Sequence, residues 1–144
     1  MATYLIIGGS SGIGLSLANL LSAEGHQVYA TYNTHPVQAA NNLISWHPLN
    51  VLDENIALDF LPEMLNGIIY CPGSINLRPF DRIKAADFIS DYNLNVVGAV
   101  KIIQAVLPRL KKASNASITL FSTVAVQNGL PFHSQVAASK GAIE

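Results

Sequence analysis

The chain has 144 residues, of which 50% are hydrophobic and 12% are charged. This length and composition predict one folded domain over residues 1–144 and exclude a disordered chain. Eight basic and nine acidic residues give a net charge of −1, which predicts no binding to nucleic acid or to an anionic membrane. The single cysteine excludes an internal disulfide. The sequence contains no cluster of metal-ligating residues, so we expect no metal site. Because no signal peptide and no apolar run of about 18 residues is present, we expect a cytoplasmic domain.

Short apolar runs alternate with helical periods along the chain. In order, the pattern predicts strand 4–7, helix 13–25, strand 27–31, short helix 36–42, strand 43–46, short helix within 53–65, strand 67–71, long helix 85–110, strand 118–121 and a helix from 134 to 144. Alternating strands and helices indicate an α/β fold, a doubly wound parallel sheet with helices on both faces. We expect the spatial strand order 3-2-1-4-5, with the sheet truncated after the fifth strand.

A glycine-rich segment, Gly8-Gly9-Ser10-Ser11-Gly12-Ile13-Gly14, lies between the first predicted strand and the first predicted helix. Glycine turns tightly and lets the backbone approach a pyrophosphate, while the start of the helix offers free N–H groups to the anion. An ordinary strand–helix turn needs fewer glycines. The segment therefore predicts phosphate binding by Gly8, Ser10, Ser11, Gly12, Ile13 and Gly14.

The chain resembles the short-chain dehydrogenase/reductase family along its whole length. The family's Thr-Gly, three residues, Gly-any-Gly motif is matched by Ile7-Gly8 and Gly12-Ile13-Gly14, with isoleucine in place of the threonine. Asn95 followed by Gly98 matches the family's long fourth helix, and the fifth predicted strand ends in a serine–threonine segment as the family's does. The resemblance implies a Rossmann-like fold and a nicotinamide dinucleotide, with Cys71, Pro72 and Gly73 on the floor of the cofactor site.

The end of the second predicted strand holds the residues that select the cofactor. Tyr32 stands where an acidic residue would bind the ribose of NAD, and Asn33 and Ser11 stand where NADP-binding members carry a cation. The acid that would repel a 2′-phosphate is absent, while Asn33, Thr34 and His35 are neutral donors. We therefore favour NADP over NAD. The resemblance places Asn50 and Val51 beside the adenine.

The family's Tyr-x-x-x-Lys motif is matched by Val136 and Lys140, so the residue that would move a proton is a valine. The resemblance gives Lys140 a role in binding the nicotinamide ribose. It assigns the remaining relay positions to Asn95 and Thr123. His133 is a substitute proton donor if the helix includes it, although a packing or capping histidine is the simpler interpretation. Ser134 is expected to cap that helix.

Two functions remain open from the sequence. The first is an NAD(P)-dependent oxidoreductase that reduces a carbonyl or oxidises an alcohol by hydride transfer. The second is a non-catalytic homologue that binds the dinucleotide as a sensor or scaffold. The resemblance also implies a homodimer or homotetramer through the fourth and fifth helices. The chain is expected to be part of a longer protein, the alternative being a minimal domain completed by dimerisation.

Overall fold

Five parallel strands form the centre of the computed structural model, which describes residues 1–37 and 41–144. They are β1 (Thr3–Ile7), β2 (Gln27–Tyr32), β3 (Ile44–Pro48), β4 (Gly67–Tyr70) and β5 (Ser117–Leu120). The sheet order is β3-β2-β1-β4-β5, and every neighbouring pair is parallel. The predicted doubly wound, Rossmann-like α/β sheet is confirmed, including its strand order.

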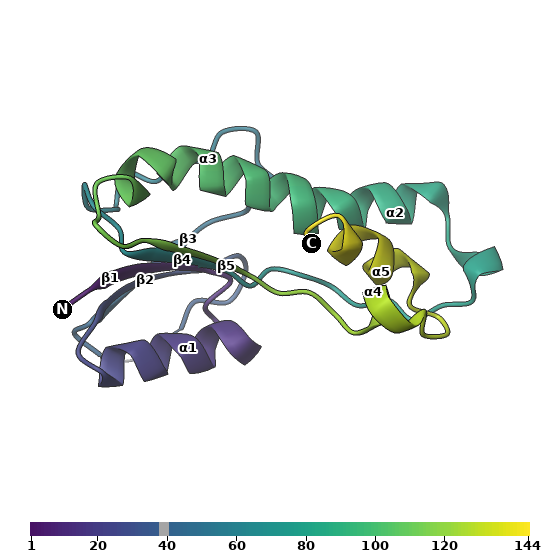
Figure 1. Cartoon of the computed structure of the whole chain (residues 1–144), viewed down its shortest axis with the longest axis horizontal. Helices are drawn as coiled ribbons and strands as arrows, with labels where there is room; N and C mark the ends of the chain where they lie inside the picture. Colours follow the sequence, from purple (N-terminus) through teal and green to yellow (C-terminus); the bar gives the residue numbers. More distant parts are fainter. Residues whose placement is uncertain (38–40) are drawn as a thin grey trace.

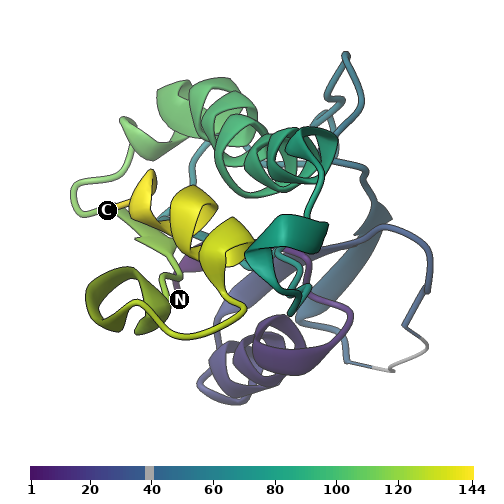
Figure 2. The same ribbon diagram turned by 90° about the vertical axis from the view of Figure 1, so that its right-hand side faces the viewer.

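Helices cover both faces of this sheet. Their bounds are α1 (Gly12–Ala23), α2 (Ala85–Tyr92), a π-helical segment (Asn93–Val97), α3 (Gly98–Leu110), α4 (Ala125–Asn128) and α5 (Ser134–Gly141), with a 3₁₀ turn at Phe80–Arg82. Helix α1 lies on one face and the α2–α3 rod lies on the other (Figure 1). Helices α4 and α5 lie beyond the carboxyl ends of the strands, which face the viewer in Figure 2.

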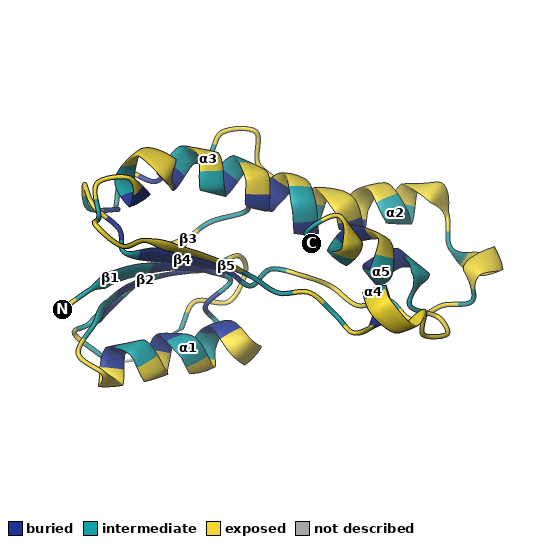
Figure 3. Cartoon of the chain, viewed as in Figure 1, coloured by how far each residue is buried: buried dark blue, intermediate teal, exposed yellow. Residues whose placement is uncertain are grey.

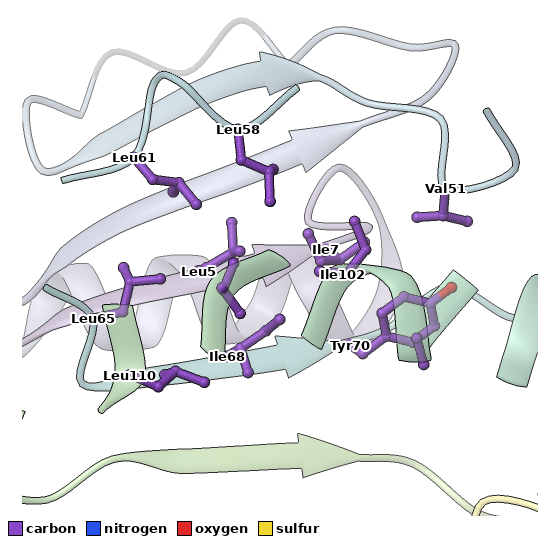
Figure 4. Close-up of a cluster of buried hydrophobic side chains, with 12 residues drawn as sticks. Leu5, Ile7, Val51, Leu58, Leu61, Leu65, Ile68, Tyr70, Ile102 and Leu110 are labelled. Atoms are coloured by element: carbon purple, nitrogen blue, oxygen red, sulfur yellow. The ribbon is translucent and has the colours of Figure 1, made fainter. Parts of the chain in front are cut away.

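Two apolar layers result from the alternation of side chains along the strands. Leu5 and Ile7 point to the side of α3, where they join Ile68, Ile102 and other fully buried side chains in the larger core (Figure 4). The intervening Ile6 points to the opposite side, toward α1, with Ala18, Val28, Ala30, Ile44 and Ile69. Buried residues therefore concentrate on the strands and the inner helix faces, while the outer faces are exposed (Figure 3).

Two predicted helices need correction. The segment 53–65 contains turns and no helix, and its Leu58, Leu61 and Leu65 reach the larger core from irregular backbone. Pro62 has no N–H to donate and disfavours helical backbone at the preceding residue, so the apolar spacing did not produce a helix. Of the predicted helix 36–42, residues 38–40 lie outside the described part of the chain, and the flanking described residues are not helical.

The predicted long helix over 85–110 is one continuous rod, but α2 and α3 are joined through the π-helical segment. Within it, Asn95 Nδ2 donates to the carbonyl oxygen of Asp91 at 2.9 Å. The Tyr70 hydroxyl, from the end of β4, donates to the carbonyl oxygen of Leu94 at 2.6 Å. Side chains thus satisfy carbonyl groups in a region where the regular helical ladder changes, as π-bulges at functional sites often require.

Candidate functional site

A cleft of about 470 Å³ opens at the carboxyl ends of β1 to β4. The structure brings thirteen of the predicted cofactor residues into its lining: Gly8, Ser10, Ser11, Gly12, Ile13, Gly14, Tyr32, Asn33, Asn50, Val51, Cys71, Pro72 and Gly73. These residues come from loops after four different strands. Parallel strands present all their carboxyl ends at one edge of the sheet, and ligands of open α/β folds bind there.

The glycine-rich loop is held in shape by Thr31, a buried residue of β2. The N–H of Gly8 donates to Thr31 Oγ1 at 3.2 Å, and the N–H of Gly9 donates to the Thr31 carbonyl oxygen at 2.7 Å. A side chain at Gly14 would overlap the carbonyl oxygen of Gly8, so glycine is needed for the first turn of α1 to sit against the loop. Thr31 was not among the predicted site residues, although a threonine at the end of a buried strand is a usable signal.

The cleft fits the pyrophosphate of a dinucleotide through backbone groups. Gly12 has φ +51°, and nothing lies within 4 Å of the position that a Cβ would occupy there, so the backbone is open to a ligand. The first turn of α1 contains no acidic residue, and the Ser11 side chain does not cap it. The lining holds no lysine or arginine among the described residues. An anion in this cleft would therefore be held by free N–H groups and by the positive end of the α1 dipole.

The end of the cleft formed by the residues after β2 and β3 is neutral and polar. Tyr32 is half-buried at the end of β2, while Asn33 and Thr34 are exposed. Asn50 is already engaged in its own turn, since its Nδ2 donates to Asp53 Oδ1 at 2.8 Å and its Oδ1 accepts from the N–H of Leu52 at 3.1 Å. Asn50 therefore shapes the lining at this end by holding the turn.

Asn95 and Lys140 do not belong to the lining of the cleft, but both come close to Gly73, which does. A Cβ built on Gly73 would lie 3.3 Å from Asn95 Oδ1 and 3.6 Å from Lys140 Nζ. Asn95 is fully buried, and its Oδ1 has no hydrogen-bond partner among the described residues. The absence of a side chain at Gly73 thus lets an amide oxygen from the π-helical segment and an ammonium from α5 approach the cleft floor together.

Burial shifts the pKa values of Lys140 and Cys71, the two titratable groups beside Gly73. Burial lowers the pKa of Lys140 below its usual value, while the Asp91 carboxylate, and the Cys71 thiol where it is ionised, act in the opposite direction. Burial raises the pKa of Cys71 to about 11, with Lys140 opposing the shift. Cys71 is therefore an uncharged thiol near neutral pH and serves as packing on the cleft floor, since nucleophilic cysteines need a depressed pKa.

Thr123 and His133 were also predicted to lie at the catalytic position, and neither belongs to the described lining of the cleft. Thr123 Oγ1 accepts from the N–H of Ala125 at 3.3 Å, at the start of α4. His133 is the N-cap residue of α5, and its Nδ1 lies 2.6 Å from the carbonyl oxygen of Pro131. Ser134, expected as the cap, is instead the first residue of α5, because the preceding residue has the non-helical backbone of a cap. Val136 is buried on α5, with 8% of its surface exposed.

Further residues of the cleft were missed or only partly anticipated. Besides Thr31, the lining includes Ile7, Thr34, His35, Leu49, Leu52 and Leu94. Leu94 belongs to the π-helical segment, which no spacing in the sequence predicts. Across the described ranges 1–37 and 41–144, no group of His, Cys, Asp or Glu side chains is arranged to hold a metal ion. No helix within these ranges combines the length and the apolar character that crossing a membrane requires.

Comparison with known proteins gives several relatives along the whole chain. It is 31% identical to human retinol dehydrogenase 8 and 30% identical to human 17-beta-hydroxysteroid dehydrogenase type 1, covering 99% and 97% of this chain. It is 29% identical to a 3-ketodihydrosphingosine reductase of Bacteroides thetaiotaomicron. The chain spans about half the length of these relatives, namely 50%, 48% and 54%.

Solved structures show the same fold. A short chain dehydrogenase/reductase family protein superposes with a TM-score of 0.88 at 26% identity, covering 99% of this chain and 63% of that one. The structure of ElxO with NADP bound superposes with a TM-score of 0.86 at 21% identity, a likeness of fold alone. The family model for short chain dehydrogenases matches residues 2–144. Because that match spans almost every residue described above, the chain belongs to the short-chain dehydrogenase family.

Proposed function

We propose that this chain is the dinucleotide-binding part of an NAD(P)-dependent oxidoreductase that interconverts a carbonyl and an alcohol. The observation that carries the proposal is one cleft in which a glycine-rich loop and the free start of α1 lie along the carboxyl ends of the strands, with Lys140 and Asn95 close to its lining residue Gly73. Relatives named as hydroxysteroid and retinol dehydrogenases support a carbonyl or alcohol substrate at the level of class.

Different residues along the cleft have different roles in this proposal. The loop from Gly8 to Gly14 binds the pyrophosphate through N–H groups. The Lys140 ammonium, beside Gly73, donates hydrogen bonds to ribose hydroxyls at the nicotinamide end. When bound, the nicotinamide supplies or accepts the hydride. Thr123, just before α4, is the residue that would hold the substrate oxygen.

NADP is the favoured cofactor in this proposal. Tyr32 carries no negative charge that would repel a 2′-phosphate, and Asn33, Thr34 and His35 are exposed donors at the same end of the cleft. The Thr34 hydroxyl lies 2.8 Å from His35 Nδ1, so the two side chains are held together at the cleft rim. A phosphate at this rim would replace that mutual contact by hydrogen bonds from both.

A second candidate function is dinucleotide binding without turnover, as a sensor or scaffold. The buried Val136 supports this alternative, because it occupies the position four residues before Lys140 and has no proton to transfer. The presence of Asn95, Thr123 and Lys140 at the other relay positions supports the enzymatic function. Both functions require the cofactor, so binding is the first property to test.

The test compares two glycine variants of the chain by calorimetry with NADP and NAD. Gly12 has φ +51° and Gly129 has φ +60°, and nothing lies within 4 Å of a Cβ at either position. Gly12→Val and Gly129→Val therefore impose similar backbone strain, but only Gly12 lines the cleft. We expect Gly12→Val to abolish binding, because its side chain occupies the space of the pyrophosphate, while Gly129→Val binds like the parent chain.

Unchanged affinity in a folded Gly12→Val variant would overturn the proposal. Equal losses in both variants would show that strain, and not occupation of the cleft, determines binding. Far-ultraviolet circular dichroism of each variant establishes folding before the titration.

A further inference from the structure

A buried carboxylate lies next to the Lys140 end of the cleft, on a residue that the proposed function does not use. Asp91 is in the last turn of α2 with only 3% of its surface exposed. Carboxylates are almost never buried without a compensating charge or hydrogen bonds, because removing the charge from water is costly. Its burial therefore needs an explanation in the surroundings.

Hydrogen bonds compensate part of the cost of burying Asp91. Asp91 Oδ1 accepts from the Ser74 hydroxyl at 2.8 Å, and the Asp91 carbonyl oxygen accepts from Asn95 Nδ2 at 2.9 Å. Asp91 Oδ2 is buried and has no hydrogen-bond partner among the described residues. One oxygen of a charged group thus remains uncompensated by any donor in hydrogen-bond reach.

The complementary charge comes from α5. Lys140 Nζ lies 3.6 Å from the Cβ position of Gly73, and Gly73 immediately precedes the Ser74 that binds the carboxylate. Asn95, which donates to the Asp91 backbone, meets the same Gly73 position with its Oδ1 at 3.3 Å. The carboxylate and the ammonium therefore flank one short stretch of backbone, from α2 and α5, without forming a direct ion pair among the described contacts.

We propose that Asp91 is the counter-ion and positioning residue of Lys140, keeping this lysine protonated at the nicotinamide end of the cleft. This inference deepens the proposed function, because it names the residue on which the ribose-binding ammonium depends. A half-buried lysine tends to lose its proton, and a nearby carboxylate of opposite charge counteracts that tendency. The direction of the Asp91 effect on the pKa of Lys140 agrees with the geometry.

The other titratable groups around Lys140 are few. Besides Asp91, α2 carries Asp87, whose Oδ2 accepts from the N–H of Lys84 at the exposed start of the helix, and the exposed Tyr92. The π-helical segment and α4 carry no titratable residue, and Lys140 is the only one within α5. Cys71 faces Lys140 from the end of β4, but its thiol is neutral near pH 7. Glu144, four residues after Lys140, accepts a hydrogen bond from the Ser122 hydroxyl. Of the two groups that raise the pKa of Lys140, Asp91 is therefore the one to test by substitution.

The test follows each lysine side chain by NMR through a pH titration of the chain without cofactor, with Lys140→Gln used to assign its signal. Asp91→Asn keeps the shape of the side chain and an acceptor for Ser74, but it removes the charge. We expect it to lower the pH at which Lys140 loses its proton by about one pH unit. Lys84, Lys101, Lys111 and Lys112 serve as internal references and should not change. Asp87→Asn, one turn earlier on α2, is the matched control and should leave Lys140 as it was.

A second variant tests the inference if Asp91→Asn does not fold. Asp91→Leu replaces a buried charge by an apolar side chain, a change that buried ionic sites often tolerate, and it should shift Lys140 in the same direction. An unchanged Lys140 midpoint in either folded variant overturns the inference, as does an equal shift in Asp87→Asn. Calorimetry with NADP on the same samples separates the two proposals: a shifted Lys140 in a chain that binds no dinucleotide would leave the counter-ion assignment standing and remove the proposed function.

Discussion

At the scale of single residues, the described lining of the cleft carries no Asp, Glu, Lys or Arg, including at the end of β2 where the proposed function would select the cofactor. Tyr32, half-buried at the end of β2, occupies the position at which an acidic residue would accept a hydrogen bond from a ribose hydroxyl. Under the proposed function, selectivity would depend on neutral donors and on the absence of repulsion, which are weaker determinants than a charge.

Tyr32→Asp tests that position. The new carboxylate would repel a 2′-phosphate and accept from the 2′-hydroxyl of NAD, so the ratio of NADP affinity to NAD affinity should fall by at least about tenfold. Calorimetric titration with both cofactors measures the ratio. Tyr32→Phe is the control, since it keeps the ring and adds no charge. A ratio that does not fall would show that Tyr32 does not select the cofactor.

Val136 is the second residue on which the choice between the two candidate functions rests. It precedes Lys140 by four positions on α5, so the two share one helix face, and a tyrosine there would place a phenol near the ammonium. Val136→Tyr in the full-length protein should raise carbonyl reduction on the order of 10²-fold, measured by oxidation of NADPH. His133→Ala supplies the contrast, because loss of activity in that variant would identify His133 as the native proton donor.

Robust native activity that neither change alters would place the active site away from α5. Absent native activity, together with no gain in Val136→Tyr, would favour the binder without turnover. The two substitutions therefore separate the two candidate functions.

At the scale of elements, the joint between α2 and α3 brings Asn95 close to Gly73, a residue of the cleft lining. The Tyr70 hydroxyl reaches the Leu94 carbonyl oxygen across a gap that exists only because residue 98 has no side chain. A Cβ on Gly98 would lie 2.5 Å from that hydroxyl oxygen. Burial raises the pKa of Tyr70, so the phenol stays protonated and continues to donate.

Gly98→Ala should therefore destabilise the fold, by about 1–3 kcal/mol, because the methyl group displaces the Tyr70 hydroxyl. Tyr70→Phe alone should cost about 1 kcal/mol for the lost hydrogen bond. In the double variant the alanine no longer meets a hydroxyl oxygen, so the combined loss should be smaller than the sum. Urea denaturation of the four proteins measures this cycle, and strict additivity would contradict the proposed clash.

At the scale of the whole molecule, stability depends on the two apolar layers that sandwich the central strands. Ile68 and Ile118 are register partners in the β4–β5 pair, but Ile68 is fully buried while Ile118 is 47% exposed. Strand β5 is the edge of the described sheet, and its first three residues are exposed. The central and edge strands thus differ strongly in how much apolar surface they bury.

Ile68→Ala should cost about 2–5 kcal/mol of unfolding free energy, since it leaves a cavity between the sheet and α3. Ile118→Ala, on the neighbouring strand, should cost less than about 1 kcal/mol. Denaturant titrations of both variants measure the difference. Equal losses would mean that the β5 edge is covered by further protein or by a second copy in solution.

Local sequence was sufficient for the strands, α1 and the glycine-rich loop, because apolar runs and glycine placement act within a few residues. The strand order followed from the general rules for doubly wound sheets. Local sequence failed at 53–65, where Leu58, Leu61 and Leu65 have helical spacing but enter the core from turns. The residues of the predicted cofactor site lie together because parallel strands end at one edge, which the strand order already implies.

Only the tertiary structure decided which polar groups meet at the far end of the cleft. Gly73, Asp91, Asn95 and Lys140 come from a loop, α2, the π-helical segment and α5. Asp91 and Asn95 are four residues apart in the chain, but no spacing relates either of them to Gly73 or Lys140. Nor does any local pattern predict the π-helical joint, at which Tyr70 from β4 approaches Gly98 across the core. Pairings between distant elements depend on packing, and packing is a property of the whole fold.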